Sequence, residues 1–259
     1  MNQLEVKEVL AHVALALILF SVFFISLVPS ILFIRYFKSP GSDNIAMFIL
    51  EVFIYLMIFL FISSASLMII PALIFRIFNL APCEGKYELK VTNKEVFKWI
   101  LSQGLYKIAM VIGRISALSK RFVNQLFGAK IGRGVIFQGD VTDPYFLEVG
   151  EYSIIGGNAK IFTHIADNPK RVLFKKVRIG KYCLIGYNAV IMPGVVLNDY
   201  VIVGANALVP KDRVLDRGVW AGIPAKKIKD YLPNIALLEP TLNIVNNLTT
   251  TPGDSLEDN

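Results

Sequence analysis

Two long apolar runs dominate the first third of the chain. Val9–Ile34 contains 26 residues and Val52–Phe75 contains 24, and neither run includes Lys, Arg, Asp or Glu. At about 1.5 Å per residue, a helix of either length crosses the roughly 30 Å hydrocarbon core of a bilayer. A short polar turn separates the runs. The pattern predicts a transmembrane hairpin over residues 1–80, with spans at about 9–34 and 45–75.

Basic residues flank the two runs unevenly. The turn between them carries Arg35 and Lys38. Five basic residues lie on the other side of the runs, before the first or after the second: Lys7, Arg76, Lys86, Lys90 and Lys94. An excess of Lys and Arg marks the cytoplasmic side of a span. For a two-span, multi-pass protein of the cell membrane, this count therefore predicts that the outer ends of both spans face the cytoplasm. Both termini and the C-terminal domain would then be cytoplasmic.

A basic amphipathic connector is expected over residues 81–128. Between Lys86 and Arg133 there are ten Lys or Arg and two Glu. Apolar residues recur there at steps of three and four, as they do in an amphipathic helix. Thr92 and Glu95 have the spacing of a capping box at its start.

Glycines are expected to divide this connector. Gly104 and Gly113 should loosen or break the helix, and Gly128 should end it. A basic amphipathic helix directly after a membrane span suits two roles. It can lie on anionic headgroups, or it can pack on the next domain with its lysines in water. The pattern leaves both open.

The second half of the chain has a six-residue repeat. Fifteen positions follow one another by six from Ile131 to Leu215, and thirteen of them are large and apolar; the other two are Asp143 and Asp167. Gly often follows the large residue. Such a repeat predicts a parallel β-helix in which three hexapeptides form each coil of about 18 residues. About five coils fit between Ile131 and Trp220.

Composition narrows the classes of function. A hydrophobic content of 54% with 18% charged residues excludes a disordered protein, and it excludes an ordinary soluble enzyme unless the apolar residues are segregated. Cys83 and Cys183 cannot form a disulfide framework, which fits a reducing compartment. His12 and His164 are the two histidines. A zinc site with three histidine ligands within one chain is therefore excluded. A zinc carbonic anhydrase of β-helix fold is excluded as well, because it needs three histidines at a subunit interface and only His164 lies in the repeat. Neither metal nor nucleic acid is expected.

Three stretches, IFTHIADN, VRIGKYCLIGYNAV and AGIPAKKI, resemble the hexapeptide-repeat acyltransferases. The resemblance implies a left-handed parallel β-helix over residues 129–231. With the apolar runs, the expected fold class of the chain is membrane α plus all-β. A projecting loop, a short C-terminal helix and a tail over 232–259 would complete it. Family members are acyl-coenzyme A-dependent enzymes that usually form homotrimers, with each active site between neighbouring subunits. The expected donor is acetyl-coenzyme A.

The projecting loop of this family helps to build the active site. Residues 163–178 contain Pro169 and read least like strand, so they are the expected loop. The resemblance makes His164, at the base of this loop, the general base, and neutral imidazole suits that role near neutral pH. Glu148, nearly one coil earlier, is the first candidate for the carboxylate that orients His164, and Asp167 is the second.

The same resemblance implies a set of coenzyme-binding residues. They are Gly186, Tyr187, Gly204 and Ala205 near the pantetheine path, and Lys211, Lys226 and Lys229 near the phosphates. Pro210 stands where the family often has Thr, so one hydroxyl contact would be missing.

A narrower resemblance concerns TDPYFLEVGEYSIIGGNAKIFTH together with VWAGIPAKKI. These stretches are similar to the membrane-embedded terminal module of the epsilon-poly-lysine synthetase type, in which six membrane helices surround three repeat domains. A homotrimer of this chain would reproduce both counts. The leading hypothesis is a bilayer-anchored O- or N-acyltransferase whose acceptor, such as a lipid-linked sugar, lies near the membrane. The alternative is a non-catalytic trimeric membrane scaffold or binding protein, which would bind no coenzyme A.

Overall fold

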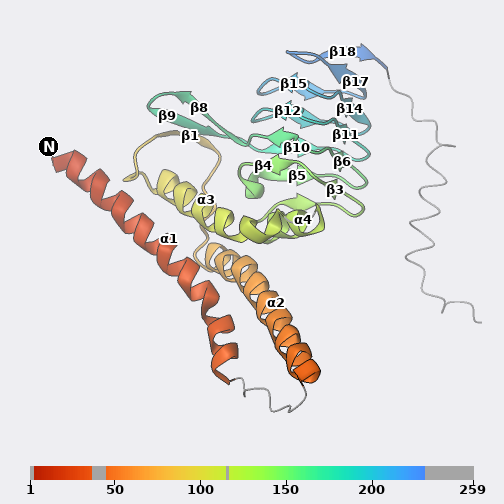
Figure 1. Cartoon of the computed structure of the whole chain (residues 1–259). Coiled ribbons are helices and arrows are strands. Elements are labelled where there is room, and N and C mark those ends of the chain that lie inside the picture. Colours follow the sequence, from red (N-terminus) through yellow and green to blue (C-terminus); the bar gives the residue numbers. More distant parts are fainter. Residues whose placement is uncertain (1–2, 37–44, 115–116, 231–259) are drawn as a thin grey trace, which may run out of the picture.

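The computed structural model describes residues 3–36, 45–114 and 117–230, which form a helical part and a β-solenoid (Figure 1). The described helices are α1 (Gln3–Tyr36), α2 (Ile45–Ile77), α3 (Lys94–Gly113) and α4 (Ala117–Leu126). One buried apolar cluster joins all four, with members such as Leu15 of α1, Phe75 of α2, Leu105 of α3 and Val123 of α4. The helices therefore form one packed unit beside the solenoid.

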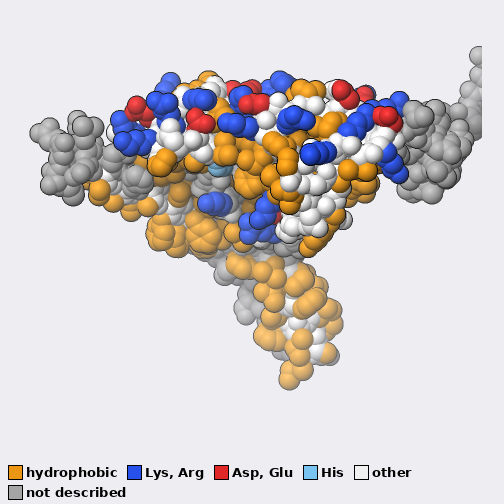
Figure 2. Space-filling view, turned by 90° about the horizontal axis from the view of Figure 1, so that it is seen from above, with side chains coloured by type: hydrophobic (Ala, Val, Ile, Leu, Met, Phe, Trp, Pro, Cys, Tyr) orange, Lys and Arg blue, Asp and Glu red, His pale blue; other side chains and the backbone are white. Residues whose placement is uncertain are grey.

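Both α1 and α2 contain stretches that are long and apolar enough to cross a membrane by length and composition. The mean hydropathy is 2.6 over Val13–Leu32 and 2.8 over Ile45–Ile77. Large apolar side chains are exposed along both helices. Figure 2 shows hydrophobic side chains over nearly the whole of a narrow projection, whereas Lys, Arg, Asp and Glu gather on the broad body. Exposed apolar surface on this scale indicates a surface that is covered by another phase or molecule.

Asn93 caps the start of α3. Its side-chain oxygen accepts hydrogen bonds from the backbone N–H groups of Glu95 (3.0 Å) and Val96 (3.4 Å). The Glu95 carboxylate accepts a hydrogen bond from the backbone N–H of Cys83 (2.7 Å). The capping box of Thr92 and Glu95 stays a prediction.

The expected breaks in the connector are only partly found. Gly113 is the last residue of α3, and Gly128 follows the end of α4 with a φ of +92°. Gly104 lies inside the unbroken helix α3, where a Cβ would collide with the side chain of Leu19 on α1. Gly104 thus allows α1 and α3 to approach closely. Since Leu105 has no exposed surface, the connector packs against the rest of the chain.

Three sheets of parallel strands form the solenoid. The first sheet contains β2 (Lys130–Ile131), β5 (Leu147–Val149), β10 (Val177–Ile179), β13 (Val196–Leu197) and β16 (Val214–Leu215). The second contains β3 (Ile136–Phe137), β6 (Ile154–Ile155), β11 (Leu184–Ile185), β14 (Val201–Val203), β17 (Gly218–Ala221) and, antiparallel at its end, β18 (Lys226–Lys229). The third contains β4 (Asp140–Val141), β7 (Lys160–Ile161), β12 (Val190–Ile191) and β15 (Leu208–Val209). The predicted parallel solenoid of about five coils is confirmed.

The repeat positions form the interior of the solenoid. Phe137, Ile155, Ile185 and Val203 occupy equivalent positions on successive strands of the second sheet and are at most 1% exposed. The next residue in each hexapeptide is commonly Gly because the coils approach closely there. At Gly150, for example, a Cβ would lie 2.6 Å from the backbone of Gly180. Both features of the repeat are thus packing requirements.

Residues 163–178 are not the loop that the sequence predicts. They contain β8 (His164–Asn168) and β9 (Arg171–Phe174), an antiparallel hairpin that projects from the solenoid toward α3 (Figure 1). A third strand, β1 (Gly85–Glu88), pairs with β9 from the segment between α2 and α3. The polar residues around Pro169 occupy the exposed end of this hairpin, which is why the segment resembled a loop.

The end of the solenoid also differs from the prediction. After a turn that contains Gly222, with a φ of +99°, the chain reverses, and β18 pairs with β17. Over the described part of this end, a strand therefore replaces the expected short helix. The predicted tail, residues 232–259, lies outside the described residues.

Candidate active site

His164 stands where the chain leaves the solenoid. It is the first residue of β8 and follows Ile161 of β7 by three residues. One coil earlier, Asp143 follows β4 at the position equivalent to Thr163, because Val141 and Ile161 are register partners. The Asp143 backbone N–H donates to the hydroxyl oxygen of Thr163 (3.1 Å). This hydrogen bond ties the corners of two neighbouring coils together.

Asp143 is the carboxylate that contacts His164. The distance from its Oδ2 to His164 Nδ1 is 2.6 Å. The Asp143 side chain is fully buried, whereas the His164 side chain is 23% exposed. The pair thus has an inner member shielded from water and an outer member that a substrate can reach.

The hydrogen bonds around Asp143 keep it ionised. Burial alone raises the pKa of this carboxyl, but hydrogen bonds and charge interaction with His164, together with hydrogen bonds from Thr163 and Gln103, lower it below its usual value. An ionised carboxylate can only accept, so the proton of neutral His164 lies on Nδ1. His164 Nε2 then carries the lone pair needed by a general base.

Three donors converge on the other carboxylate oxygen, and two come from α3. Trp99 Nε1 donates to Asp143 Oδ1 over 3.0 Å, and the Gln103 amide donates to the same atom. The Tyr145 hydroxyl donates the third hydrogen bond over 3.1 Å. Burial and the charge of Asp143 raise the pKa of Tyr145 well above its usual value, so it stays a neutral donor. The site is therefore built jointly by the solenoid and the helical part.

A pocket of about 270 Å³ opens beside His164. Phe162, Ile165, Ala166 and Met192 form the rest of its lining. Phe162 follows β7 and Met192 follows β12, so the pocket spans two coils at the base of the hairpin. An otherwise apolar lining leaves the imidazole as the reactive group in this pocket.

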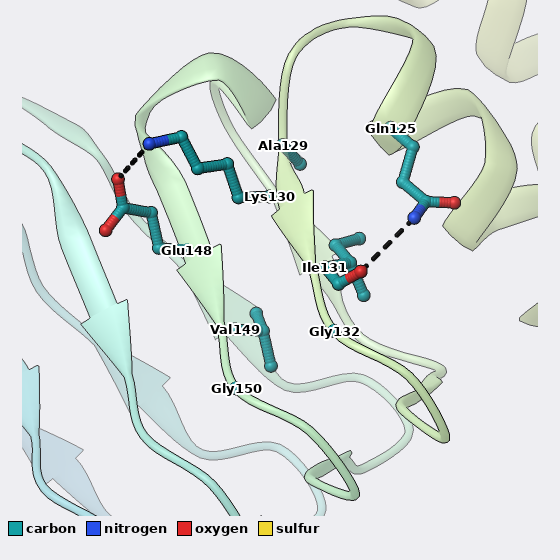
Figure 3. Close-up of a pocket in the computed structure, with 8 residues that line it drawn as sticks. All are labelled: Gln125, Ala129, Lys130, Ile131, Gly132, Glu148, Val149 and Gly150. Carbon is teal, nitrogen blue, oxygen red and sulfur yellow. Dashed lines mark hydrogen bonds and ion pairs between the residues drawn. The ribbon is translucent and has the colours of Figure 1, made fainter.

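Glu148 does not orient His164. It lies on β5, where Lys130 and Arg178 are its register partners on the two neighbouring strands. Its carboxylate pairs with Lys130 (3.1 Å), Arg178 (3.3 Å) and Lys176 (3.3 Å). Figure 3 shows Glu148 turned to Lys130. Both residues line a separate pocket of about 570 Å³, which Gln125 of α4 and residues of the first coils complete. The hairpin adds residues between β5 and β10, which is why counting by 18 misplaced this carboxylate.

The second candidate, Asp167, is also not the carboxylate that contacts the His164 ring. Its carboxylate pairs with Lys86 (3.3 Å) and Lys211 (3.8 Å). Lys211 is thus the predicted coenzyme residue that lies on the hairpin side of the solenoid. The structure brings it to the same corner as His164.

The other predicted coenzyme residues lie elsewhere. Gly186 and Tyr187 follow β11, and Gly204 and Ala205 follow β14, so all four share the corner between the second and third sheets. Gly186 has a packing reason to be glycine, since a Cβ there would lie 2.5 Å from the Ala205 nitrogen. Lys226 and Lys229 are exposed at the two ends of β18. Within one chain, the third sheet separates Ala205 from His164.

One sequence signal could have identified Asp143. It occupies a repeat position where thirteen of fifteen residues are large and apolar. A carboxylate at an interior position requires buried donors, which an aliphatic core does not supply. Among the residues that the structure describes, no group of three or more His, Cys, Asp or Glu is arranged to hold a metal ion.

Comparison with known proteins gives the family. Residues 176–211 match the model for "Bacterial transferase hexapeptide (six repeats)". The chain is 33% identical over 118 residues to "Putative acetyltransferase YvoF" of Bacillus subtilis (strain 168), which covers 45% of this chain and 67% of that protein. The chain belongs to the hexapeptide-repeat transferases. As a member of this family, it is an acyltransferase.

Other relatives share the repeat domain. "Putative colanic acid biosynthesis acetyltransferase WcaF" of Escherichia coli (strain K12) is 27% identical over 136 residues, covering 43% of this chain and 74% of that protein. A maltose O-acetyltransferase of Clostridium difficile 630 has a solved structure that aligns with a TM-score of 0.46 and 16% identity. That alignment covers 57% of this chain and 94% of the other.

Proposed function

We propose that this hexapeptide-repeat acyltransferase is anchored in a membrane and transfers an acetyl group from acetyl-coenzyme A to a membrane-proximal hydroxyl or amine. The observation that carries the proposal is the contact between buried Asp143 and half-buried His164 beside an open pocket. The acetyl donor is inferred from the relatives, because YvoF and WcaF carry that activity in their names.

In the proposed reaction, His164 is the general base. Its Nε2 takes the proton of the acceptor hydroxyl or amine while the acceptor atom attacks the thioester carbonyl. Asp143 holds the Nδ1 proton and stabilises the imidazolium that forms. When the C–S bond breaks, the imidazolium returns its proton to the leaving thiolate, so the products are the acetylated acceptor and free coenzyme A.

A homotrimer would unite the two halves of the site. Ala205 and His164 lie at the two corners that flank the third sheet, at opposite ends of its strands. A coenzyme held at the Ala205 corner therefore needs His164 of a neighbouring subunit. The outer face of the second sheet also offers an aliphatic stripe. Its members are Ile136, Ile154, Leu184, Ile202 and Val219, which are register partners from coil to coil. We propose that coenzyme phosphates meet Lys211, Lys226 and Lys229.

The anchor is assigned to α1 and α2. Their hydropathy and exposed apolar side chains support two membrane spans, and the distribution of Lys and Arg supports cytoplasmic termini and a cytoplasmic solenoid. The hairpin would be residues 1–80, the connector 81–128, a left-handed β-helix 129–231 and the tail 232–259. Three copies would match the six helices and three repeat domains of the epsilon-poly-lysine synthetase-type module.

The acceptor would be an envelope precursor, such as a lipid-linked sugar. The membrane anchor would hold the pocket near such molecules, and the name of WcaF connects that relative with polysaccharide biosynthesis. Basic residues at the hairpin, such as Lys170 and Arg171, would attract an anionic acceptor.

Calorimetric titration of the detergent-purified protein with acetyl-coenzyme A tests the proposal. Saturable binding should weaken in a Lys226→Ala/Lys229→Ala variant, while His164→Ala should bind the coenzyme and lose transfer to screened envelope acceptors. A well-folded protein that binds no acetyl-coenzyme A would overturn the proposed function. Full transfer activity in His164→Ala would overturn the mechanism.

A further inference from the structure

We infer that Trp99 and Gln103 of α3 are positioning residues of the active site, which act on His164 through Asp143. This inference rests on the proposed function of His164 as general base. The inference gives a role in catalysis to α3, a helix outside the solenoid that packs against the apolar helices and the projecting hairpin.

The two side chains hold one oxygen of the buried carboxylate. Trp99 Nε1 and the Gln103 amide both donate to Asp143 Oδ1. Oδ2 contacts His164 Nδ1 and accepts hydrogen bonds from the hydroxyls of Thr142 and Thr163. The Gln103 amide also donates to the carbonyl oxygen of Thr142 (2.6 Å). A carboxylate fixed at both oxygens has one orientation, so its contact with His164 Nδ1 has one geometry.

Trp99 also contacts the imidazole itself. The Trp99 and His164 rings meet edge-on with centroids 4.9 Å apart, and Phe174 of the hairpin packs on Trp99 at 5.5 Å. The indole therefore limits rotation of the His164 ring while its N–H holds the carboxylate. These are two independent means of fixing the base.

The remaining faces of α3 explain why a helix supplies these donors. Gly104 lies against Leu19 of α1, and Leu105 is buried in the cluster that joins the four helices. The helix is thus held from behind by α1 and α2. Loss of this packing would move Trp99 and Gln103 relative to Asp143.

Two substitutions remove the donors: Gln103→Met nearly keeps side-chain volume, and Trp99→Phe keeps an aromatic ring but is smaller. We expect each to lower kcat about tenfold, as loss of a hydrogen bond to a charged group does, with KM for both substrates within about twofold. Tyr106→Phe is the matched control, because it removes a buried α3 hydrogen bond to Asn124 (2.7 Å) that does not touch the site. It should leave kcat unchanged.

A double-mutant cycle separates positioning from general support. In an Asp143→Asn background, which cannot hold the tautomer, both substitutions should change kcat less than about twofold. An unchanged kcat in the single variants would overturn the inference. An equal loss of kcat in the Asp143→Asn background, or in Tyr106→Phe, would also overturn it, because the role of α3 would then be purely structural.

A measurement without substrate covers variants of low activity and separates this inference from the proposed function. The chain has two histidines, so ¹⁵N-histidine NMR can report the His164 tautomer. We expect Nδ1–H in the native protein and mixed tautomers in Trp99→Phe/Gln103→Met. A native tautomer in that double variant would overturn the inference even if His164 is the base. Mixed tautomers, with full activity in His164→Ala, would retain the positioning and reject the proposed mechanism.

Discussion

Two corners of the solenoid differ in how they are built. Between the second and third sheets, Asn158, Asn188 and Asn206 occupy equivalent turn positions, and their amides are linked by hydrogen bonds of 2.8 Å. Between the third and first sheets, the corresponding places hold a short helical turn, η1 (Pro144–Phe146), after Asp143, and the hairpin that begins at His164. The first corner is maintained by its own repeat. The second needs contacts from a helix outside the solenoid.

The difference teaches where chemistry can be placed in a repeat protein. A regular coil surrounds each residue with copies of its own environment, so it offers few donors for a buried charge. The interruption admits α3 and the hairpin, and they supply the donors that Asp143 requires. The pair that we propose as the reactive centre thus lies where the repeat is broken.

The strongest test of this contrast removes the reactive ring. We expect His164→Ala to lower kcat by roughly 100- to 10,000-fold, because the acceptor then lacks its proton acceptor. Thermal unfolding should change little, since His164 is partly exposed. Transfer assays with saturating acetyl-coenzyme A measure the first effect, and native-like kcat would place the chemistry elsewhere.

Restoring the repeat at the broken corner should also be harmful. Asp143→Leu supplies the apolar residue that the periodicity favours, but it removes the carboxylate that accepts the partly buried N–H groups of Trp99 and Gln103, and Gln103 keeps only the Thr142 carbonyl. We expect the free energy of unfolding to fall by roughly 3 kcal/mol. Denaturant unfolding would measure this loss, with Asp143→Asn as the milder control. A more stable Asp143→Leu protein would contradict the account of this corner.

The regular corner should tolerate change better. Asn188 has a φ of +55° and bonds to both neighbouring Asn residues. We expect Asn188→Ala to cost about 1 kcal/mol, mainly because alanine adopts positive φ poorly, with kcat unchanged. Asn188→Gly should cost less, since glycine accepts that conformation. A large fall in kcat at saturating acetyl-coenzyme A in either variant would show that the Asn188 side chain does more than stabilise its turn.

The smallest expected effect is on the pH dependence of stability. The pKa of Asp143 is lower in the folded protein than in the unfolded chain, so its stabilising contribution is complete above the unfolded value, about 3.9, and is lost as pH falls through the folded value. Native stability should therefore fall more steeply below about pH 4 than that of Asp143→Asn. Melting curves from pH 3 to 7 test the sign, and identical slopes would contradict it.

Sequence reasoning succeeded where the cause is local or periodic. The apolar helices follow from long uncharged runs, and the solenoid follows from a six-residue period whose interior positions must be apolar. His164 was found as a candidate because the resemblance to the hexapeptide-repeat acyltransferases places a general base at the foot of the projecting loop. Glu148 was wrong as its partner, since inserted residues change which positions of successive coils become neighbours.

The sequence alone thus determined the two apolar runs, the repeat, its interruption and a candidate base beside it. Only the tertiary structure decided that Asp143 is the carboxylate on His164, and that Trp99 and Gln103 hold it from 44 and 40 residues away. The physical reason is that hydrophobic periodicity records which face of a local segment is buried. The partner of a buried charge depends on which segments pack together, and no local pattern contains that information.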